Sequence, residues 1–338
     1  MQNQGRRVLI CDPTLRDGNH AVRHQLTCEQ ITKYAVAANA AGVPVIEVGH
    51  GNGLGASSLQ VGLSKTDDKS ALEAARKALT TTKLGIHIIP GFATIKKDLR
   101  LALDVGVDVF RIATHCTEAD ITERHISHIR GHGREVYGVL MMSHMASEAV
   151  LVEEASKMQA YGAEGVVIMD SAGAYLPSDV TVRIGALVNT LGIPVGFHGH
   201  NNLGMAIANS IAAVNAGAVI IDGTARGFGA GAGNTQLEAL VAVFDKLKIQ
   251  TGIDLYKVLD AGDVAEKYLI ETLPTISSVS IVSGLSGVFS GYVKPVNRIA
   301  SEYKLDPRDI FFELGRRKVV AGQEDMIIEV ATDLSKRG

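Results

Sequence analysis

The sequence predicts a (β/α)8 barrel followed by a helical C-terminal extension. The first observation is a set of eight short runs rich in Val and Ile, each followed by a helical pattern. The runs lie near Val8–Cys11, Val45–Val48, Gly85–Ile89, Val107–Ile112, Val136–Met141, Gly165–Met169, Pro194–His198 and Ala218–Ile221. Nearly continuous apolarity is typical of parallel strands that are buried on both faces. The second observation is their number, because eight units in roughly 240 residues favour a closed barrel over an open doubly wound sheet.

Start and stop signals between these runs support the intervening helices. Thr27 with Gln30, and Thr235 with Glu238, match the capping-box pattern that begins a helix. Gly42 stands where a residue in the left-handed conformation commonly ends a helix. These signals alternate with the apolar runs, as a chain of βα units requires.

The alternation of strands and helices stops after about Leu247, and the remainder is mostly helical in pattern. Asp306 and Pro307 predict the start of one of these later helices, since Asp caps helices and Pro favours their first position. We therefore assign residues 1–250 to the barrel, with a metal site, and residues 251–338 to a helical extension packed on it.

Composition excludes several classes of protein. The formal net charge is −3, Trp is absent and aromatic residues make up 5% of the chain, so we expect no nucleic-acid partner. No apolar run approaches the ~20 residues of a membrane span, and the first residues lack the apolar core of a signal peptide. None of the three cysteines forms a C-x-x-C pair, and free thiols suit a reducing cytoplasm.

A metal site is predicted at the carboxyl ends of the strands, where barrels of this type place their active sites. His198 and His200 are two residues apart on one strand, so both side chains lie on one face. Asp17 follows the first strand, and only the eighth strand separates the first from the seventh in a closed barrel. Two imidazoles and one carboxylate leave coordination positions open and suit Mn, Fe, Co or Zn. Such a set could activate a carbonyl as a Lewis acid or serve iron-dependent oxygenation.

Three further polar residues near the strand ends are candidates for chemistry. Arg16 precedes Asp17 and could hold an enolate or carboxylate oxygen. His20 could transfer a proton near neutral pH. Ser171 follows the sixth strand and could donate a hydrogen bond to a substrate carboxylate.

A glycine-rich segment follows the eighth strand. Residues 227–232, GFGAGA, match the dinucleotide-binding pattern G-x-G-x-x-A. That pattern also requires a further strand that ends in an acidic residue, and no such strand follows here. We interpret the segment as a tight turn that brings backbone close to the site, with Asn234 supporting it.

Several segments resemble those of one enzyme family. DPTLRDGNH at residues 12–20 resembles the first-strand signature of the 4-hydroxy-2-oxovalerate aldolases. The resemblance continues through ATHCTEAD (113–120), MMSHM (141–145), DSAG (170–173), HGHNN (198–202) and GQEDM (322–326). These aldolases form the pyruvate-aldolase branch of the superfamily that contains hydroxymethylglutaryl-CoA lyase and isopropylmalate synthase. The resemblance therefore covers nearly the whole chain.

This resemblance implies a Mn2+-dependent class II aldolase, although other divalent metals could serve. Its small-molecule substrate would be a 4-hydroxy-2-oxo acid, cleaved to pyruvate and an aldehyde. The implied metal ligands are Asp17, His198 and His200. Arg16 would stabilise the pyruvate enolate, His20 would act as the base, and Ser171 would position the substrate carboxylate. The family usually pairs with an acylating aldehyde dehydrogenase, which is the partner that the resemblance implies.

Two residues depart from the family pattern and bear on substrate binding. Phe289 stands where the family typically has a tyrosine that is thought to protonate the enolate. Water could replace that proton donor, or Tyr292 could reach in from three residues further on. His87 lies in the third strand, where the family is usually aliphatic, and could place a polar group in the pocket for the aldehyde end.

Three alternatives to the aldolase remain at this stage. A Claisen-type lyase or synthase acting on an acyl-CoA could use the same superfamily site. An iron oxygenase could use the same three ligands. A catalytically altered homologue could serve as a scaffold for the dehydrogenase partner, but a cluster of polar ligands is costly to retain without a function.

Overall fold

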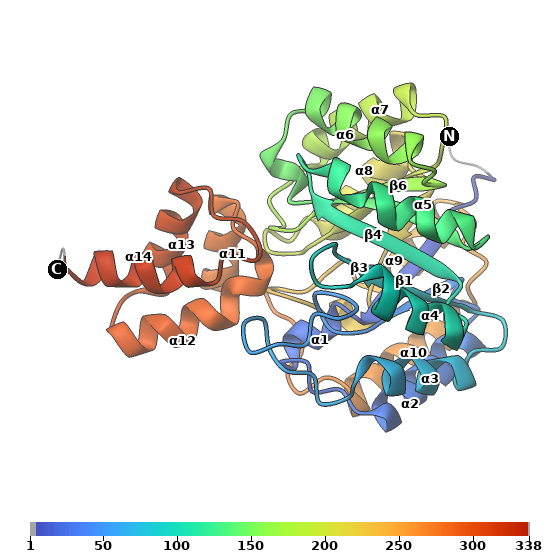
Figure 1. The fold of residues 1–338 in the computed structure, drawn as a ribbon, viewed down its shortest axis with the longest axis horizontal. Coiled ribbons are helices and arrows are strands. Elements are labelled where there is room, and N and C mark those ends of the chain that lie inside the picture. Colours follow the sequence, from blue (N-terminus) through green and yellow to red (C-terminus); the bar gives the residue numbers. More distant parts are fainter. Residues whose placement is uncertain (1–4, 337–338) are drawn as a thin grey trace.

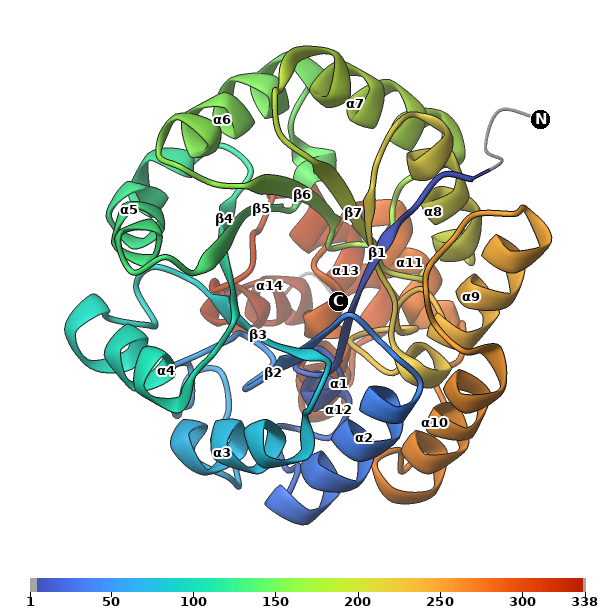
Figure 2. The ribbon, with the colours of Figure 1, turned by 90° about the vertical axis from the view of Figure 1, so that its right-hand side faces the viewer.

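Eight parallel strands close into a barrel in the computed structural model, which describes residues 5–336. The strands are β1 (Leu9–Leu15), β2 (Val45–Val48), β3 (Lys83–Ile88), β4 (Val109–His115), β5 (Glu135–Met141), β6 (Gly165–Asp170), β7 (Val195–Gly199) and β8 (Ile220–Asp222). Each strand pairs in parallel with the next, and β8 also pairs with β1, which closes the ring. Figure 2 looks along this barrel. The predicted fold class is confirmed.

Each of the eight predicted runs overlaps a strand, but the strand ends differ from the prediction by a few residues. β4 continues to His115, which pairs with Met141 of β5. β8 continues to Asp222, which pairs with Cys11 of β1. Polar residues at the carboxyl ends stay in the strand ladder because they face the barrel interior. Apolarity alone therefore places these ends too early.

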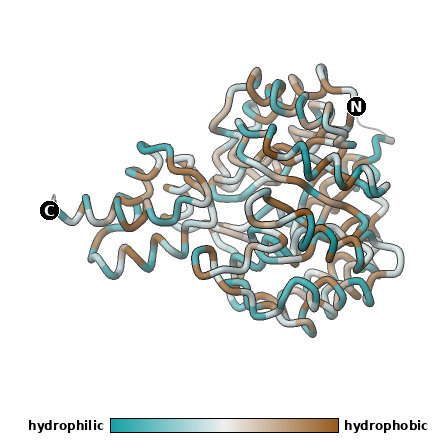
Figure 3. Tube along the Cα trace, in the orientation of Figure 1, coloured by the Kyte–Doolittle hydropathy of each residue, from teal (hydrophilic) through white to brown (hydrophobic). Residues whose placement is uncertain are grey.

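Helices surround the barrel in a ring (Figure 2). They are α2 (Cys28–Ala40), α3 (Asp68–Ala78), α4 (Arg100–Val105), α5 (Glu123–Gly131), α6 (Glu148–Ala160), α7 (Pro177–Thr190), α8 (Ala206–Asn215), α9 (Leu237–Lys246) and α10 (Leu255–Tyr268). The one-turn helix α1 (Gly18–Ala21) follows β1 and lies inside this ring. Hydrophobic and hydrophilic residues alternate along most helices of the ring (Figure 3). This alternation is expected of helices that bury one side against a barrel.

The helix start signals give one confirmed and one wrong prediction. Thr27 and Gln30 form a capping box at the start of α2, as predicted. The predicted capping box of Thr235 and Glu238 is absent, because α9 begins at Leu237. The Glu238 carboxylate instead pairs with the guanidinium of Arg226, 2.8 Å away. A tertiary ion pair thus takes the side chain that the local pattern would have used.

The last four helices form a separate bundle beside the barrel (Figure 1). They are α11 (Ser278–Ser286), α12 (Val293–Tyr303), α13 (Pro307–Arg316) and α14 (Asp325–Ser335). Asp306 caps α13 and Pro307 begins it, as predicted. The bundle buries a hydrophobic core of its own, whereas α10 contributes to the core of the barrel.

The bundle lies over the carboxyl ends of the barrel strands. Ser290 donates its backbone N–H to the carbonyl of Ser171, 2.9 Å away, just after β6. His144 Nε2 lies 2.8 Å from the carbonyl oxygen of Gly287. The segment between α11 and α12 therefore forms part of the wall around the predicted site. Within residues 5–336, no helix is long and apolar enough to cross a membrane.

Candidate active site

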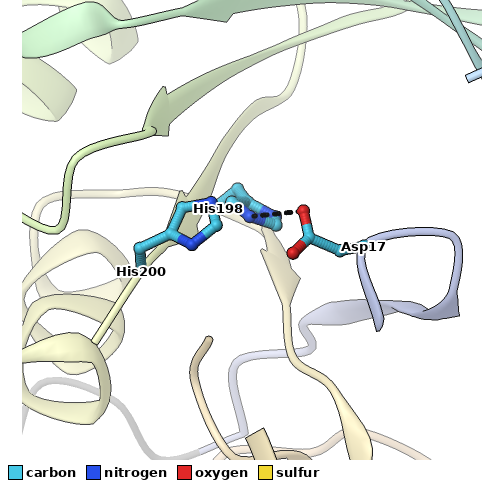
Figure 4. Close-up of side chains that lie close together, drawn as sticks. All are labelled: Asp17, His198 and His200. Atoms are coloured by element: carbon cyan, nitrogen blue, oxygen red, sulfur yellow. Dashed lines mark ion pairs between the residues drawn. The ribbon is translucent and has the colours of Figure 1, made fainter. Parts of the chain in front are cut away.

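Asp17, His198 and His200 come together at the carboxyl end of the barrel. One potential ligand atom from each lies within 4.8 Å of the others, and all three side chains are buried. The two imidazole rings are 5.1 Å apart between centroids, and both stand on the side that faces Asp17 (Figure 4). Strand β8 alone separates β7 from β1, so barrel closure brings Asp17 and His198, which are 181 positions apart in the sequence, into one group.

The nitrogens of the two histidines are arranged to accept a metal ion. His198 donates from Nδ1 to the Asp222 carboxylate at 2.8 Å, since a carboxylate can only accept. Its Nε2 is buried without a hydrogen-bond partner, as is Nδ1 of His200. Burial lowers the pKa of His200 to about 3, so this ring is neutral at physiological pH. Unpartnered buried nitrogens with free lone pairs beside a carboxylate fit a divalent cation.

Asp17 is held as an ionised group by its surroundings. Its Oδ1 accepts hydrogen bonds from Ala230 N at 3.1 Å and from Asn234 Nδ2 at 3.0 Å, and its Oδ2 pairs with Arg16 at 2.6 Å. Burial raises the pKa of Asp17, but Arg16 and the nearby histidines outweigh it and hold the pKa well below its usual range. The carboxylate is therefore available to a cation.

The glycine-rich segment lets its backbone approach Asp17, as the sequence interpretation requires. A Cβ at Gly229 would lie 2.7 Å from Asp17 Oδ1 and 2.3 Å from Asn234 Nδ2, which leaves no room for a side chain. The segment leads into helix α9 and not into a strand, so it lacks the context of a dinucleotide site.

Arg16 points one unused donor into the site. Its Nε donates to Glu47 at 2.6 Å and its Nη1 to Asp17, while its Nη2 is buried without a partner. The side chain is 3% exposed, so the unpartnered Nη2 is shielded from bulk solvent. A fixed guanidinium with one free donor can bind an anionic oxygen.

His20 lies on α1, partly buried, with its ring against the backbone of Gly51. A Cβ at Gly51 would come within 2.6 Å of the His20 ring. The Phe289 ring also packs against His20, with the two ring centroids 6.0 Å apart in an edge-to-face arrangement. Burial lowers the pKa of His20 below its ordinary value, which favours the neutral form that can accept a proton. The structure thus places Phe289 beside the predicted base.

Tyr292 does not reach the site. Its hydroxyl donates to the carbonyl of Val320 at 2.7 Å and accepts from Gln323 N at 3.0 Å, inside the helical bundle. The proposal that it could replace the missing tyrosine is therefore wrong. The backbone turns through a short 3₁₀ segment at Ser290–Tyr292, so a spacing of three residues leads away from the site.

Ser171 directly follows β6, and His87 lies on β3. Ser171 accepts a hydrogen bond from Met142 N at 2.9 Å, which leaves its hydroxyl proton free for another acceptor. His87 Nδ1 lies 3.6 Å from Glu47 and has no hydrogen-bond partner. Burial, followed by the charge of Arg16, lowers the pKa of His87 to about 3. A neutral His87 therefore adds a polar but uncharged group near Arg16.

A network of buried charges under the site escaped the sequence reasoning. Glu47 on β2, Arg111 on β4 and Asp222 on β8 are each at most 2% exposed. Burial raises the pKa of Glu47, but Arg16 and Arg111 outweigh it and lower the pKa to about 2. One sequence signal could have indicated this network: Glu47 is a charged residue inside the otherwise apolar run Val45–Val48. A charge buried in a strand needs a buried partner of opposite charge.

A cleft of about 350 Å³ reaches the site between the barrel and the bundle. His20 and the segment 228–231 line its inner part, and Ser290 and Lys294 line the side toward the bundle. A small organic acid could enter a cleft of this size and contact His20, while Asp17, His198 and His200 are not among the residues that line it.

Comparisons with known proteins agree with this geometry. The HMGL-like family model matches residues 7–265, and the DmpG-like communication domain matches residues 274–336. A 4-hydroxy-2-oxovalerate aldolase from Spirochaeta aurantia is 66% identical over 100% of this chain and 99% of its own. One from Pectobacterium atrosepticum is 65% identical over 98% of this chain and 97% of its own.

Solved structures confirm the barrel. The carboxyl transferase domain of Rhizobium etli pyruvate carboxylase, solved with oxamate and biotin, superposes with a TM-score of 0.84. The superposition covers 98% of this chain and 61% of that one, at 17% sequence identity. A likeness at this identity concerns the fold alone.

Proposed function

We propose that this chain, which belongs to the HMGL-like family, is a divalent-metal-dependent aldolase that cleaves 4-hydroxy-2-oxo acids to pyruvate and an aldehyde. The observation that carries the proposal is the buried group of Asp17, His198 and His200 with the free donor of Arg16 beside it. Relatives that are 65–66% identical over nearly the whole chain bear the name of this activity, which supports the same assignment here.

We further propose that the metal is Mn2+, held by Asp17, His198 and His200. Two nitrogens and one carboxylate oxygen form a mixed set, and a 2-oxo acid adds hard oxygen donors, which Mn2+ accepts. When bound, the metal supplies a Lewis acid that polarises the 2-oxo group. The remaining steps belong to the side chains of this chain.

In the proposed reaction His20 accepts the proton of the C4 hydroxyl. The C3–C4 bond then breaks, the aldehyde leaves, and the electron pair forms the enolate of pyruvate. The free Nη2 of Arg16 donates to the developing oxyanion, and Ser171 donates to the carboxylate. His87 lies near Arg16 and Glu47, where we propose that it contacts the aldehyde end. A water molecule finally protonates the enolate carbon to give pyruvate, and the hydroxide left behind takes the proton from His20.

Pyruvate release tests the proposed function. Metal-loaded protein is incubated with several 4-hydroxy-2-oxo acids of increasing chain length, and pyruvate is measured. Cleavage without coenzyme A supports the aldolase. A strict requirement for an acyl-CoA would instead indicate the Claisen-type reaction, and consumption of oxygen would indicate an oxygenase.

Substitution of Arg16 is expected to slow catalysis. Arg16→Ala should lower kcat by about 10²–10³-fold, because it removes a donor that faces the developing negative charge. Arg16→Lys should also be impaired, since a point charge does not reproduce the planar fork that joins Glu47 and Asp17. Steady-state kinetics at saturating Mn2+ measure the effect. An unchanged kcat in Arg16→Ala would assign Arg16 a structural role only.

Phe289 leaves the enolate without a protein hydroxyl at this position, and we propose that water delivers the proton. Phe289→Tyr should then speed exchange of the pyruvate methyl protons with solvent deuterium, because a new hydroxyl would stand beside His20. Proton NMR of pyruvate in D2O measures this exchange and needs no aldehyde. Fast exchange in the original protein, unchanged by Phe289→Tyr, would place the proton donor elsewhere.

The C-terminal bundle supports an assembly with an acylating aldehyde dehydrogenase. Residues 274–336 match the DmpG-like communication domain, and the bundle exposes large apolar side chains, among them Leu285 and Phe312. Such side chains mark a docking surface where they form a contiguous patch. We also propose a cytoplasmic location, which the three free cysteines support.

A further inference from the structure

We propose that Arg111 is a positioning residue that holds the metal ligand His198 and the enolate-binding Arg16 in place through two buried carboxylates. The proposal rests on the proposed function for the roles of His198 and Arg16. The proposal adds that the guanidinium of Arg111 fixes the positions of His198 and Arg16 relative to each other.

Arg111 spans the interior of the barrel. Its Nη2 lies 2.8 Å from Asp222 on β8, the strand opposite β4 in the ring. Its Nη1 donates to Glu47 on β2 at 2.9 Å and to Cys11 Sγ on β1 at 3.2 Å. The guanidinium is 1% exposed, so no solvent screens these contacts. One planar group therefore ties three other strands to β4.

The Asp222 arm fixes the metal ligand. The same oxygen of Asp222, Oδ2, meets both Arg111 and Nδ1 of His198, each at 2.8 Å. This contact keeps the proton of His198 on Nδ1 and leaves the Nε2 lone pair facing Asp17, 3.9 Å away. A carboxylate behind a metal-binding histidine sets its tautomer and ring orientation. Arg111 in turn holds the Asp222 carboxylate in place through the 2.8 Å contact.

The Glu47 arm fixes Arg16. Glu47 uses one oxygen for Arg111, at 2.9 Å, and the other for Nε of Arg16, at 2.6 Å. With Nε and Nη1 both occupied, the only unpartnered nitrogen of Arg16 is Nη2. Without Arg111, the Glu47 carboxylate would lose one of the two guanidiniums that orient it. Its contact with Arg16 would then be less firmly fixed.

Charge balance explains why this position needs a cation that reaches two partners. Asp17, Glu47 and Asp222 are three buried acids, and Arg16 and Arg111 are the two guanidiniums that contact them. In formal charges, three carboxylates and two guanidiniums sum to −1, and a divalent cation brings this sum to +1. A lysine ammonium would be a point charge on a shorter reach, unable to form the fork between Glu47 and Asp222.

Arg111→Lys tests the proposal with Mn2+ as the probe. The Mn2+ dissociation constant, measured by equilibrium dialysis of metal-free protein, should rise about 10–100-fold. At saturating Mn2+, kcat should remain about tenfold or more below that of the unaltered protein, because Arg16 is also displaced. Arg317→Lys is the matched control, since Arg317 also joins three carboxylates, but within the bundle. It should change neither quantity.

Two milder substitutions separate the arms and serve if Arg111→Lys does not fold. Asp222→Asn should weaken Mn2+ binding, with most of the loss in kcat recovered at saturating Mn2+. Glu47→Gln should lower kcat at saturating Mn2+ and leave Mn2+ affinity within about threefold. A purely structural role predicts lower thermal stability for these variants with unchanged Mn2+ affinity and kcat, and that result would overturn the proposal.

The dialysis separates this proposal from the proposed function. If the protein binds Mn2+ but cleaves no 4-hydroxy-2-oxo acid, the proposed function fails, while weaker binding by Arg111→Lys and Asp222→Asn still supports the metal arm. If cleavage is found and none of the three substitutions changes affinity or kcat, the proposed function stands and the role of Arg111 is refuted.

Discussion

His200→Ala is expected to lose bound metal and aldolase activity together. The substitution removes one of three side chains whose ligand atoms lie within 4.8 Å of each other, so the remaining pair holds a divalent cation only weakly. Lewis-acid stabilisation contributes several kcal/mol to such reactions, and its loss corresponds to a fall in kcat of about 10³-fold or more. Metal content after dialysis and pyruvate release, measured on the same preparation, check both expectations.

The control for this experiment is a histidine outside the metal group. His125 on α5 contacts the carbonyl of Ala93 at 3.1 Å, and His125→Ala should keep both metal and activity. Rigorously chelated protein should lose activity, and added Mn2+ should restore it. Full activity in His200→Ala, or in the chelated protein, would refute the metal-dependent mechanism.

His20→Ala should slow cleavage by about 10²–10⁴-fold, the usual contribution of a general base. A base must be neutral to accept the proton, so kcat/KM of the unaltered protein should fall as the pH drops through the pKa of His20. Burial lowers that pKa from its ordinary value of 6.5, so the decline should lie on the acid side of 6.5. In His20→Ala this acid limb should flatten.

The pH profile of kcat/KM distinguishes a base from a merely structural residue. His24 is a matched control, because its ring packs edge-to-face against His20 at 5.3 Å but its Nδ1 is occupied by Gly51 N. His24→Ala should retain the acid limb, even where the rate falls because the ring no longer supports His20. An acid limb that persists unchanged in His20→Ala would assign the base elsewhere.

The sequence alone predicted the fold class and the three potential metal ligands because both depend on short-range patterns. Apolar runs of four to six residues mark buried parallel strands, and their number limits the topology to few alternatives. The i, i+2 spacing of His198 and His200 fixes their shared face through strand geometry. Barrel closure then requires Asp17 to be near, since strand order follows chain order.

Only the tertiary structure decided how these groups are oriented and connected. Glu47, Arg111 and Asp222 lie on three different strands, and their pairing depends on side-chain directions inside the barrel that no local pattern encodes. The same limit explains two wrong predictions. Glu238 pairs with Arg226 and forms no capping box with Thr235. Tyr292 turns into the bundle, where its hydroxyl donates a hydrogen bond to the carbonyl of Val320. Long-range contacts carry larger stabilisation than a single cap or spacing, and buried polar groups take the partners that the fold brings to them.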